Sequence, residues 1–401
     1  MERSSCQLGR KFNTEKIRRV VFRISAWCVP LKSSNRLILL CFSTFLLTTG
    51  VGATIPALAQ KVYSLSLSNK IVSFVVGIWG LSFTILSAFS GFLIDLFGRR
   101  TTVLLGLTGA SASGAIMMFS NSISMLALSR FLTGASEALV LNSFITTTTF
   151  ESSEKREGSL GLLYASMGFG LFSGPFLYSY VFESAPKSGF ILLIILPIIS
   201  AFLLPQLHGE IPYKKKSYLN LGRLGLPLII ALFIGALEGY LQGAGVGLVE
   251  AWGYNPSEFS KMLSIYFAFS LIVQVLMPYI TRITRADSLA VYFSLLTLFA
   301  SSSAYYVLKS KTFLFIFSSS FGGTIAACNV ALTFLTSELT SEKERAYAIG
   351  ALSSAYSLGY FFSPVFVSGI KDLNLGAFFM IGLLVTQAFA LRFLLRSINE
   401  A

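Results

Sequence analysis

Charged side chains are scarce in this chain of 401 residues, since Asp, Glu, Lys and Arg together make up only 12% of it. Histidine occurs once, as His208, and the four cysteines (Cys6, Cys28, Cys41 and Cys328) are too scattered for metal-ligand spacing. No nucleophile–base pair and no glycine-rich phosphate-binding loop is apparent. We therefore expect no enzyme, no metal and no cofactor, and we interpret the cysteines as reduced thiols.

Hydrophobic residues make up 54% of the chain, and the mean hydropathy is +0.72. A bilayer core about 30 Å thick requires roughly 20 apolar residues per spanning helix. The sequence therefore predicts an all-α membrane protein with short loops. Apolar runs of the required length predict twelve transmembrane helices, near residues 37–59, 71–95, 101–119, 122–148, 158–181, 189–206, 224–249, 260–280, 288–307, 312–336, 346–369 and 375–397.

The net charge of +13 could indicate nucleic-acid binding, so the position of the basic residues must decide. Of the 31 Lys and Arg residues, 23 fall on the side of the membrane that holds the N-terminus, and 7 fall on the other. This bias is typical of cytoplasmic segments. We expect a multi-pass protein with both termini in the cytoplasm and no nucleic-acid partner. The cell membrane is the expected location, with an organelle membrane as the alternative.

The first 36 residues form a basic tail with nine Lys and Arg residues. A disordered cytoplasmic tail is the first interpretation. A segment lying on an anionic membrane surface and an organelle transit peptide are two alternatives. No secretory signal peptide is apparent, because no apolar core follows the early charges.

An internal repeat appears when the chain is shifted by 189 residues. The shift predicts two related six-helix halves, residues 37–206 and 224–398, joined by a cytoplasmic linker at 207–223. Such halves place a transporter's binding site at their interface, near the middle of the membrane. The superposed pairs are Gly134 with Gly323, Arg156 with Arg345, Gly161 with Gly350, Gly170 with Gly359, and Pro175 with Pro364.

A charged turn between two apolar runs carries the most specific signal. The segment Gly-Phe-Leu-Ile-Asp-Leu-Phe-Gly-Arg-Arg resembles the loop between helices 2 and 3 of the major facilitator superfamily of transporters. Leu96 departs from the pattern, because the family usually has a basic residue there. The resemblance implies two pseudo-symmetric six-helix bundles that transport by alternating access. The matching positions are Gly91, Asp95, Gly98, Arg99 and Arg100.

In transporters that this chain resembles, the turn latches the cytoplasmic side by contacting helix 11 and the loop after helix 4. Glu151, Glu154 and Arg156 in that loop are candidate partners here. The alternative is a static salt bridge at the surface, worth about 0–1 kcal/mol.

Three charged residues lie inside predicted spans, where each costs several kcal/mol and calls for a reason. Arg130 and Glu137 are two turns apart on one helical face, with Gly134 between them making room for a neighbour. Glu238 lies near the middle of helix 7. The run from Arg130 to Gly134 resembles the family's helix 4 motif, in which a buried arginine supports proton coupling.

Two roles compete for the two glutamates. Either carboxylate could carry the coupled proton, or Glu137 could be the permanent counter-ion of Arg130. A third possibility, compatible with both, is that a carboxylate attracts a cationic substrate. The resemblance implies that helices 1, 4, 7 and 10 line the cavity. Further candidates for its lining are Asn142, Tyr240, Gln242, Gln274 and Asn329.

The end of helix 1, from Gly50 to Leu58, resembles a motif of the twelve-helix drug/proton antiporters. The run from Gly170 through Gly174 to Pro175 resembles their signature in helix 5, whose Gly-Pro pair bends the helix at the interface. The departure is at Tyr178 and Ser179, where that signature ends on glycine.

We therefore predict proton-coupled export of a drug-like or amphipathic compound. The expected partners are a small-molecule substrate, protons and the lipid bilayer, and the chain is expected to be a monomer. A proton symporter or facilitator of a small metabolite is one alternative. A non-transporting membrane sensor on the same fold is the other.

Overall fold

The computed structural model describes residues 33–149, 153–181, 185, 187–203, 221–251, 254, 257–283, 311–341 and 344–367. The described part is helical and contains no β-strand, which confirms the predicted all-α fold. The helices are α2 (Ser33–Ser66), α3 (Asn69–Phe97), α4 (Arg99–Phe119), α5 (Ile123–Thr149), α6 (Ser153–Phe176) with the π-turn η2 (Leu177–Val181), α7 (Ser188–Leu203), α8 (Leu221–Ala251), α9 (Ser257–Ile283), α11 (Lys311–Leu339) and α12 (Arg345–Val367).

Ten of the twelve predicted spans have a counterpart among these helices. The predicted helices near 288–307 and 375–397 lie outside the described residues, as do His208 and most of the tail and the linker. Helix α2 is longer than predicted at both ends: it begins at Ser33, contains Pro56, and ends at Ser66 before a turn at Leu67. Boundaries of this kind are the least certain part of a prediction from sequence.

Eight of the described helices are long and apolar enough to cross a membrane, and α7 is a shorter apolar helix. Many of their buried polar residues are Ser and Thr, whose hydroxyl groups donate to a carbonyl oxygen four residues earlier. Thr44 donates to Leu40 over 2.8 Å, and Thr84 donates to Gly80 over 2.7 Å. Because a bilayer offers no water, this local bonding lets hydroxyl side chains lie within apolar helices.

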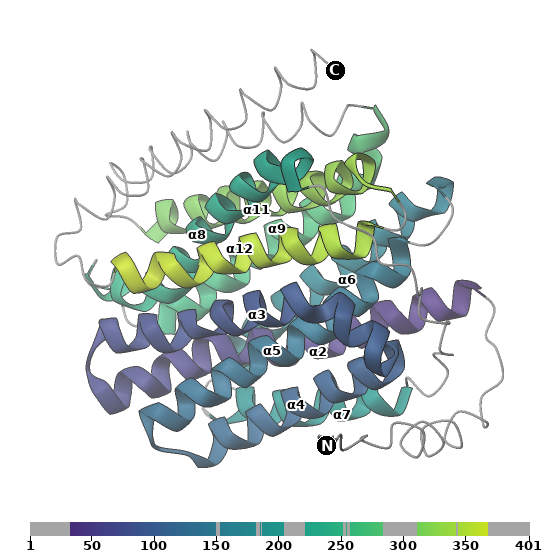
Figure 1. Cartoon of the computed structure of the whole chain (residues 1–401). Helices are drawn as coiled ribbons and strands as arrows, with labels where there is room; N and C mark the ends of the chain where they lie inside the picture. The colour runs from purple at the N-terminus through teal and green to yellow at the C-terminus, as the bar shows by residue number, and fades with distance from the viewer. Residues whose placement is uncertain are drawn as a thin grey trace, which may run out of the picture.

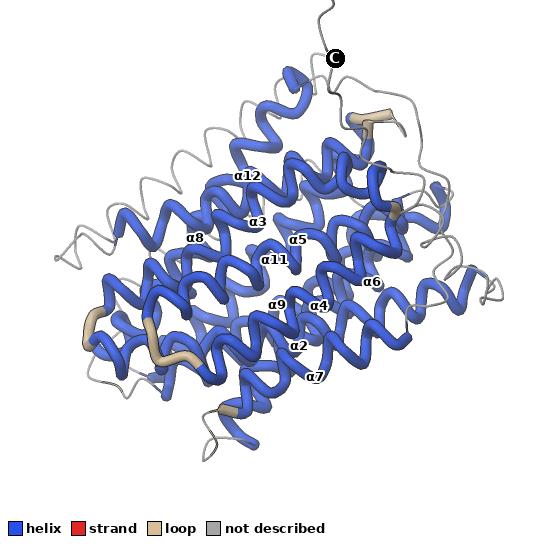
Figure 2. Tube along the Cα trace, turned by 60° about the horizontal axis from the view of Figure 1, so that its bottom comes forward, coloured by secondary structure: helices blue, strands red, loops and turns tan. Residues whose placement is uncertain are grey.

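The helices run side by side in two groups (Figures 1 and 2). In the first group α2 packs on α6 and α7, while α5 packs on α3 and α4. In the second group α8 packs on α12, and α9 packs on α11. The two groups meet along two seams, where α3 packs on α12 and α6 packs on α9. Helices α4 and α7 take no part in either seam.

The repeated glycines make equivalent contacts in the two groups. Gly170 lies against the backbone of α2 at Phe45, and its counterpart Gly359 lies against the backbone of α8 at Leu232. Gly134 packs on α3, and Gly323 packs on α9. The shift of 189 residues therefore relates the packing of the two groups as well as their sequences.

Both seams between the groups depend on small residues. A Cβ atom added to Gly80 of α3 would lie 2.5 Å from the carbonyl oxygen of Ser357 on α12. Close beside it, the hydroxyl groups of Thr84 and Ser357 are 2.9 Å apart. On the other seam, Gly168 of α6 lies against Gln274 and the backbone of α9. Glycine thus lets the two groups approach closely enough to bond.

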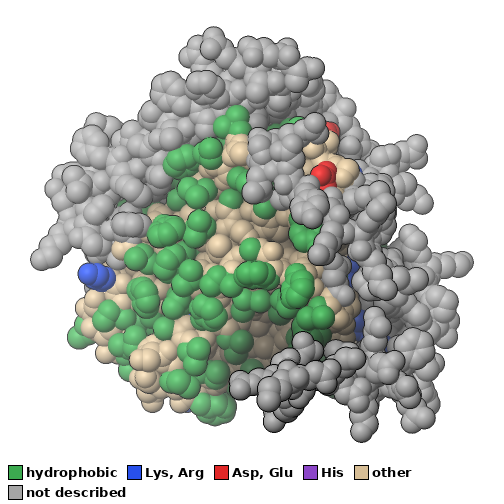
Figure 3. All heavy atoms as spheres, viewed as in Figure 1, with side chains coloured by type: hydrophobic (Ala, Val, Ile, Leu, Met, Phe, Trp, Pro, Cys, Tyr) green, Lys and Arg blue, Asp and Glu red, His purple; other side chains and the backbone are tan. Residues whose placement is uncertain are grey.

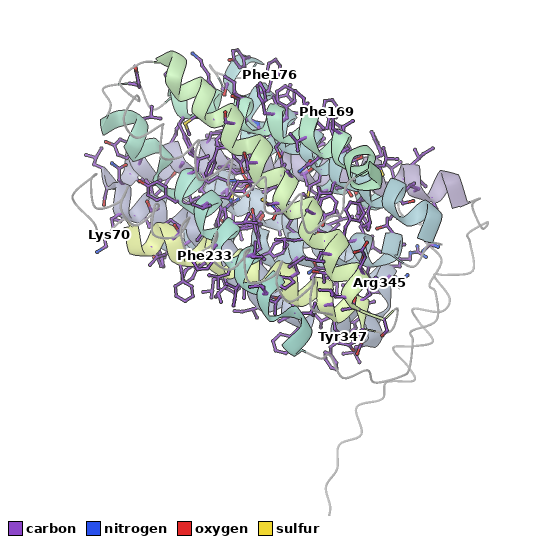
Figure 4. All side chains as sticks on the ribbon, turned by 90° about the horizontal axis from the view of Figure 1, so that it is seen from above. Lys70, Phe169, Phe176, Phe233, Arg345 and Tyr347 are labelled. Carbon is purple, nitrogen blue, oxygen red and sulfur yellow. The ribbon has the colours of Figure 1, made fainter. Side chains whose placement is uncertain are left out.

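The outer surface of the bundle is apolar. Figure 3 shows hydrophobic side chains spread over the visible face, with a basic side chain at its edge. Phe169 and Phe176 of α6 point outward in Figure 4, and 47% and 39% of their surfaces are exposed. An exposed apolar surface of this kind suits contact with lipid tails.

Gly98 alone connects α3 to α4, serving as the C-cap of the first helix and the N-cap of the second. Its φ of 79° and ψ of 153° lie in a region that is essentially restricted to glycine. Its N–H donates to Ile94 over 2.8 Å, and its carbonyl oxygen accepts from Thr102. The turn predicted around this glycine therefore requires it for conformation.

We predict that Gly98→Ala lowers the free energy of unfolding by about 1–3 kcal/mol, because alanine is strained at this φ. No atom lies within 4 Å of the added Cβ, so crowding does not contribute. Denaturant unfolding in detergent micelles measures the change. Gly158→Ala in α6 is the matched control, since its Cβ also meets open space and its φ is not positive. Equal effects of the two substitutions would contradict the prediction.

Candidate functional site

A cavity lies between the two groups of helices. Its empty space amounts to about 1090 Å³, counting the part open to solvent, and its wall is mostly apolar. Side chains from α2, α3, α5, α6, α8, α9, α11 and α12 line it, whereas α4 and α7 contribute none. Arg130, Glu137 and Glu238, the three charged residues predicted inside spans, all lie in this wall.

Glu238 projects from α8 and is only 8% exposed. Gln242, one helical turn later, donates from Nε2 to Glu238 Oε1 over 2.8 Å. Tyr356 of α12 donates its hydroxyl group to Oε2, and the hydroxyl group of Tyr266 on α9 is also bonded to the carboxylate. Three donors from three helices therefore surround one buried carboxylate.

Tyr360 connects this carboxylate to the other group of helices. Its hydroxyl group donates to Gln242 Oε1 over 2.8 Å, and its oxygen accepts a hydrogen bond from Arg130 of α5. The result is a continuous chain from Arg130 through Tyr360 and Gln242 to Glu238. This chain crosses the boundary between the two groups inside the cavity.

Glu137 is buried on α5, two turns after Arg130, and is 4% exposed. Trp79 of α3 donates from its indole Nε1 to Glu137 Oε2 over 2.8 Å. The same indole ring lies 5.9 Å from the guanidinium carbon of Arg130, within cation–π range. Trp79 therefore contacts both charged residues of α5, and Gly134 between them packs directly on its backbone.

Arg130 and Glu137 form no ion pair within 4.0 Å in the described part of the chain, although they share a helical face. Arg130 is 1% exposed, and its Nε and Nη1 atoms have no hydrogen-bond partner. The arrangement is therefore a cation and a carboxylate with an indole beside both.

Most of the further cavity candidates line the wall. Gln242, Asn142, Gln274 and Asn329 all do so, and Asn142 donates from Nδ2 to Ser87 over 2.8 Å. Tyr240 does not line the cavity and instead packs half-buried against the apolar core. It lies two residues from Glu238, so a helix turns the two side chains to nearly opposite faces.

Sequence reasoning missed four aromatic residues of the site. These residues supply the donors and the ring around the charged side chains, and they are Trp79, Tyr266, Tyr356 and Tyr360. One signal was present, because Tyr356 and Tyr360 are four residues apart and share a face of α12. The shared face could have identified them as a pair, but it could not have shown which residues they contact.

The charged turn lies at the end of the bundle where α12 begins. A Cβ added to Gly91 would lie 3.2 Å from the ring of Tyr347 on α12. Helix α12 corresponds to the eleventh predicted span, so the turn contacts the helix that the resemblance implies. Figure 4 shows Tyr347 and Arg345 at this end and Lys70 at the opposite one. Arg99 and Arg100 begin α4 and are partly buried.

Other side chains of the predicted latch lie outside the described part of the chain. The side chains of Asp95, Glu154 and Arg156 lie outside the described part of the structure, as does Glu151 entirely. Arg345, the repeat counterpart of Arg156, is 6% exposed.

The predicted helix-bend motif lies within one group of helices. Gly170 and Gly174 face α2, whose backbone at Thr49 and Ala53 approaches Gly174. The helix continues through Pro175 and changes to a π-turn at Leu177. A π-turn directly after a proline fits the loss of a backbone donor there. The glycine that faces the other group is Gly168, one turn of helix before the motif's centre.

No group of three or more His, Cys, Asp or Glu side chains in the described residues could hold a metal ion. Cys41 and Cys328 are both buried and form no disulfide among the described residues.

Comparison with known proteins places this fold and sequence among transporters. Residues 40–221 match the sequence model of the Major Facilitator Superfamily. The chain is 24% identical over 374 residues to the quinolone resistance protein NorA of Staphylococcus aureus, covering 86% of this chain and 92% of the relative. It is 23% identical over 365 residues to multidrug resistance protein 1 of Bacillus subtilis, covering 86% and 91%. A shorter match, 33% identical over 162 residues, covers 39% of this chain and 40% of the class B tetracycline resistance protein of Escherichia coli.

Two solved structures share the fold at low sequence identity. The nucleoside transporter NupG superposes with a TM-score of 0.67 at 14% identity, covering 89% of this chain and 98% of its own. The human organic anion transporter MFSD10 superposes with a TM-score of 0.68 at 16% identity, covering 90% and 100%. These matches bear out the predicted resemblance to that superfamily and confirm the predicted fold. Ten of the twelve predicted helices lie in the described part of the chain.

The bond between Trp79 and Glu137 can be tested with a double-mutant cycle of Trp79→Phe and Glu137→Gln. We expect a coupling of roughly 1 kcal/mol in the free energy of unfolding, because both substitutions weaken the same bond: phenylalanine has no donor, and glutamine accepts without a charge. Detergent-induced unfolding measures it. Pairing Trp79→Phe with Glu258→Gln provides the control, since Glu258 bonds to Lys261 at the end of α9. Additivity of Trp79→Phe and Glu137→Gln within about 0.5 kcal/mol would contradict the bond.

Proposed function

We propose that this chain, a transporter of the major facilitator superfamily, exports amphipathic drug-like molecules in exchange for protons. The relatives named for quinolone, tetracycline and multidrug resistance support drug export. The cavity supports an amphipathic substrate, because its wall is mostly apolar and aromatic with a few fixed charges.

One observation carries the proposal of proton coupling. Glu238 accepts hydrogen bonds inside the cavity, and its partner Gln242 is bonded through Tyr360 to Arg130 on the opposite group. A change in the charge of this carboxylate must therefore alter bonds that join the two groups. A protein that alternates between two arrangements needs such a link between the proton and the interface.

The steps follow from the geometry of these bonds. With Glu238 ionised, Tyr356 and Gln242 both donate to it, which holds α12 against α8. A proton on the carboxyl group removes the charge that strengthens these bonds. Gln242 and Tyr360 can then reorient, and the bond from Arg130 weakens. Glu137, bonded to Trp79 in the same cavity, is a second carboxylate that can exchange a proton.

Two hydrogen bonds between the groups lie at the opposite end from the charged turn. Ser73 of α3 donates to the carbonyl oxygen of Gly243 on α8 over 3.0 Å. Gln60 of α2 bonds to Ser260 of α9 over 3.4 Å. Alternating access would break these contacts as the groups rock, and it would expose the cavity at that end.

The latch at the charged turn belongs to the same proposal. Contact between Gly91 and Tyr347 supports a closure there that depends on the close approach of α3 and α12. Asp95 and Arg99 would hold this closure with Glu151 and Arg156. We assign both termini to the cytoplasm, and this assignment rests on the distribution of Lys and Arg. We also propose that the protein is a monomer in the cell membrane. The two halves would be residues 37–206 and 224–398.

The first test replaces the proton carrier. In proteoliposomes, Glu238→Gln should abolish substrate-triggered proton efflux while leaving substrate exchange without a gradient within about threefold, because glutamine keeps the shape but not the titrating group. Glu258→Gln is the matched control and should retain efflux. Unchanged proton efflux in Glu238→Gln would remove this residue from the mechanism. Proton entry together with substrate in the wild type would instead indicate symport.

The second test breaks the chain between the groups. Tyr360→Phe removes the hydroxyl group that joins Gln242 to Arg130, so the rate of coupled transport should fall by about tenfold or more, equivalent to about 1.4 kcal/mol in the barrier. Substrate affinity measured without a gradient should change by less than threefold. Tyr240→Phe, outside the cavity wall, serves as the control. Normal coupling in Tyr360→Phe would show that the two groups communicate by another route.

A further inference from the structure

Arg130 is a buried cation whose bonding is incomplete. It is 1% exposed and lines the cavity, yet Nε and Nη1 have no hydrogen-bond partner. Tyr360, a neutral group, accepts one bond, and the ring of Trp79 lies 5.9 Å from the guanidinium carbon. The nearby carboxylate of Glu137 is engaged by Trp79 instead. Unpaired donors on a buried charge are costly, so an anionic group that bonds to Nε and Nη1 would stabilise the site.

The cavity wall also carries buried hydrogen-bond acceptors that have no partner. Asn142 and Gln274 are 2% and 4% exposed, and Asn142 Oδ1 and Gln274 Oε1 accept no hydrogen bond. Both are amide oxygens, so they require donors. Asn142 lies twelve residues after Arg130 on α5, which corresponds to a rise of roughly 18 Å. Unpaired donors and unpaired acceptors are therefore separated along the cavity.

Much of the remaining wall is apolar and aromatic, and Glu137 lies between Arg130 and Asn142 on α5. Trp79, Phe83, Leu141 and Met167 line the cavity along with the polar groups. A ligand that satisfies the whole wall would have an aromatic or aliphatic body. It would carry an acidic group at one end and hydrogen-bond donors, such as an amine or amide, at the other.

We propose that the cavity binds amphipathic aromatic molecules that carry a carboxylate or similar acidic group, and that Arg130 is the counter-ion of this group. The N–H or O–H donors of the same molecule meet Asn142 and Gln274. This inference rests on the proposed function, since it defines the substrate of that cavity. A purely cationic compound binds less well, because it leaves the guanidinium without a partner and places a second positive charge near it.

The test uses two dyes that differ in one group. Rhodamine B combines a cationic aromatic ring system with a free carboxylate, and its ethyl ester lacks the negative charge. Binding of both to the full chain in lipid nanodiscs, without any proton gradient, is measured by fluorescence anisotropy. We expect the free acid to bind the wild type about tenfold or more tightly than the ester, because only the acid forms charge-assisted bonds to the guanidinium.

Variants locate the source of this preference. Arg130→Met should raise the dissociation constant of the acid by about tenfold or more and leave that of the cationic ester unchanged or lower it, so the preference disappears. Arg130→Lys should retain part of it, because it keeps the charge. Lys61→Met is the control cation: Lys61 donates to the carbonyl oxygen of Met117 outside the cavity wall, and its loss should change neither dye.

Further measurements distinguish a change in dye binding from a failure to fold and from a failure of the proposed function. Gel filtration and thermal unfolding check that each variant folds. If Arg130→Met does not fold, the binding of acid and ester by the wild type and by Arg130→Lys tests the inference instead. Equal binding of acid and ester by the wild type would overturn the inference, as would a preference that persists in Arg130→Met. Dye-triggered proton efflux is measured independently in proteoliposomes. A preference for the acid without any proton movement would reject the proposed antiport and leave the inference standing.

Discussion

A buried guanidinium with no carboxylate at ion-pair distance is the constraint on which the cavity depends. Arg130 is 1% exposed, and its neighbours contribute part of the interaction that water would otherwise supply. Tyr360 accepts a hydrogen bond from it, and the ring of Trp79 faces it. Both neighbours come from other helices, one from each side of a seam between the two groups. Gly134 permits this arrangement, because its missing side chain brings α3 into contact with the face of α5 that carries the charge.

The packing repeats between the two groups, but the charges do not. Gly170 and Gly359 make equivalent contacts, as do Gly134 and Gly323. The shift of 189 residues, however, places Arg130 on Ser319 and Glu137 on Ala326, and it places Glu238 on Thr49. Each charged residue thus has a small or hydroxyl-bearing counterpart, whose burial costs less free energy than that of a charge. The duplicated scaffold supplies two similar halves, while the residues proposed for coupling occur once each.

The sequence predicted the helices, the buried charges and the glycine turn, because hydropathy and residue type express them directly. It did not predict which aromatic side chains meet the charges. The chain has 16 tyrosines and 3 tryptophans, and contacts between helices depend on rotations and rises that no local pattern encodes. The prediction of Tyr240 as a cavity residue could have been avoided by considering helical geometry. It was expected in the cavity beside Glu238, yet two residues along a helix correspond to a turn of about 200°, whereas four return to the same face, as Gln242 does.

In the proposed mechanism, Tyr360 would make substrate binding and proton binding interdependent. Its oxygen accepts from Arg130, and its hydroxyl group donates to Gln242, which in turn donates to Glu238. An acidic group on the substrate that bonds to Nε and Nη1 would share the positive charge with Tyr360 and so weaken this chain at one end. A proton on Glu238 would weaken it at the other end. Because coupling between two binding events is reciprocal, each ligand must change the affinity for the other by the same factor. The exchange of substrate for a proton then requires no direct contact between them, only the hydrogen-bonded chain that both events modify.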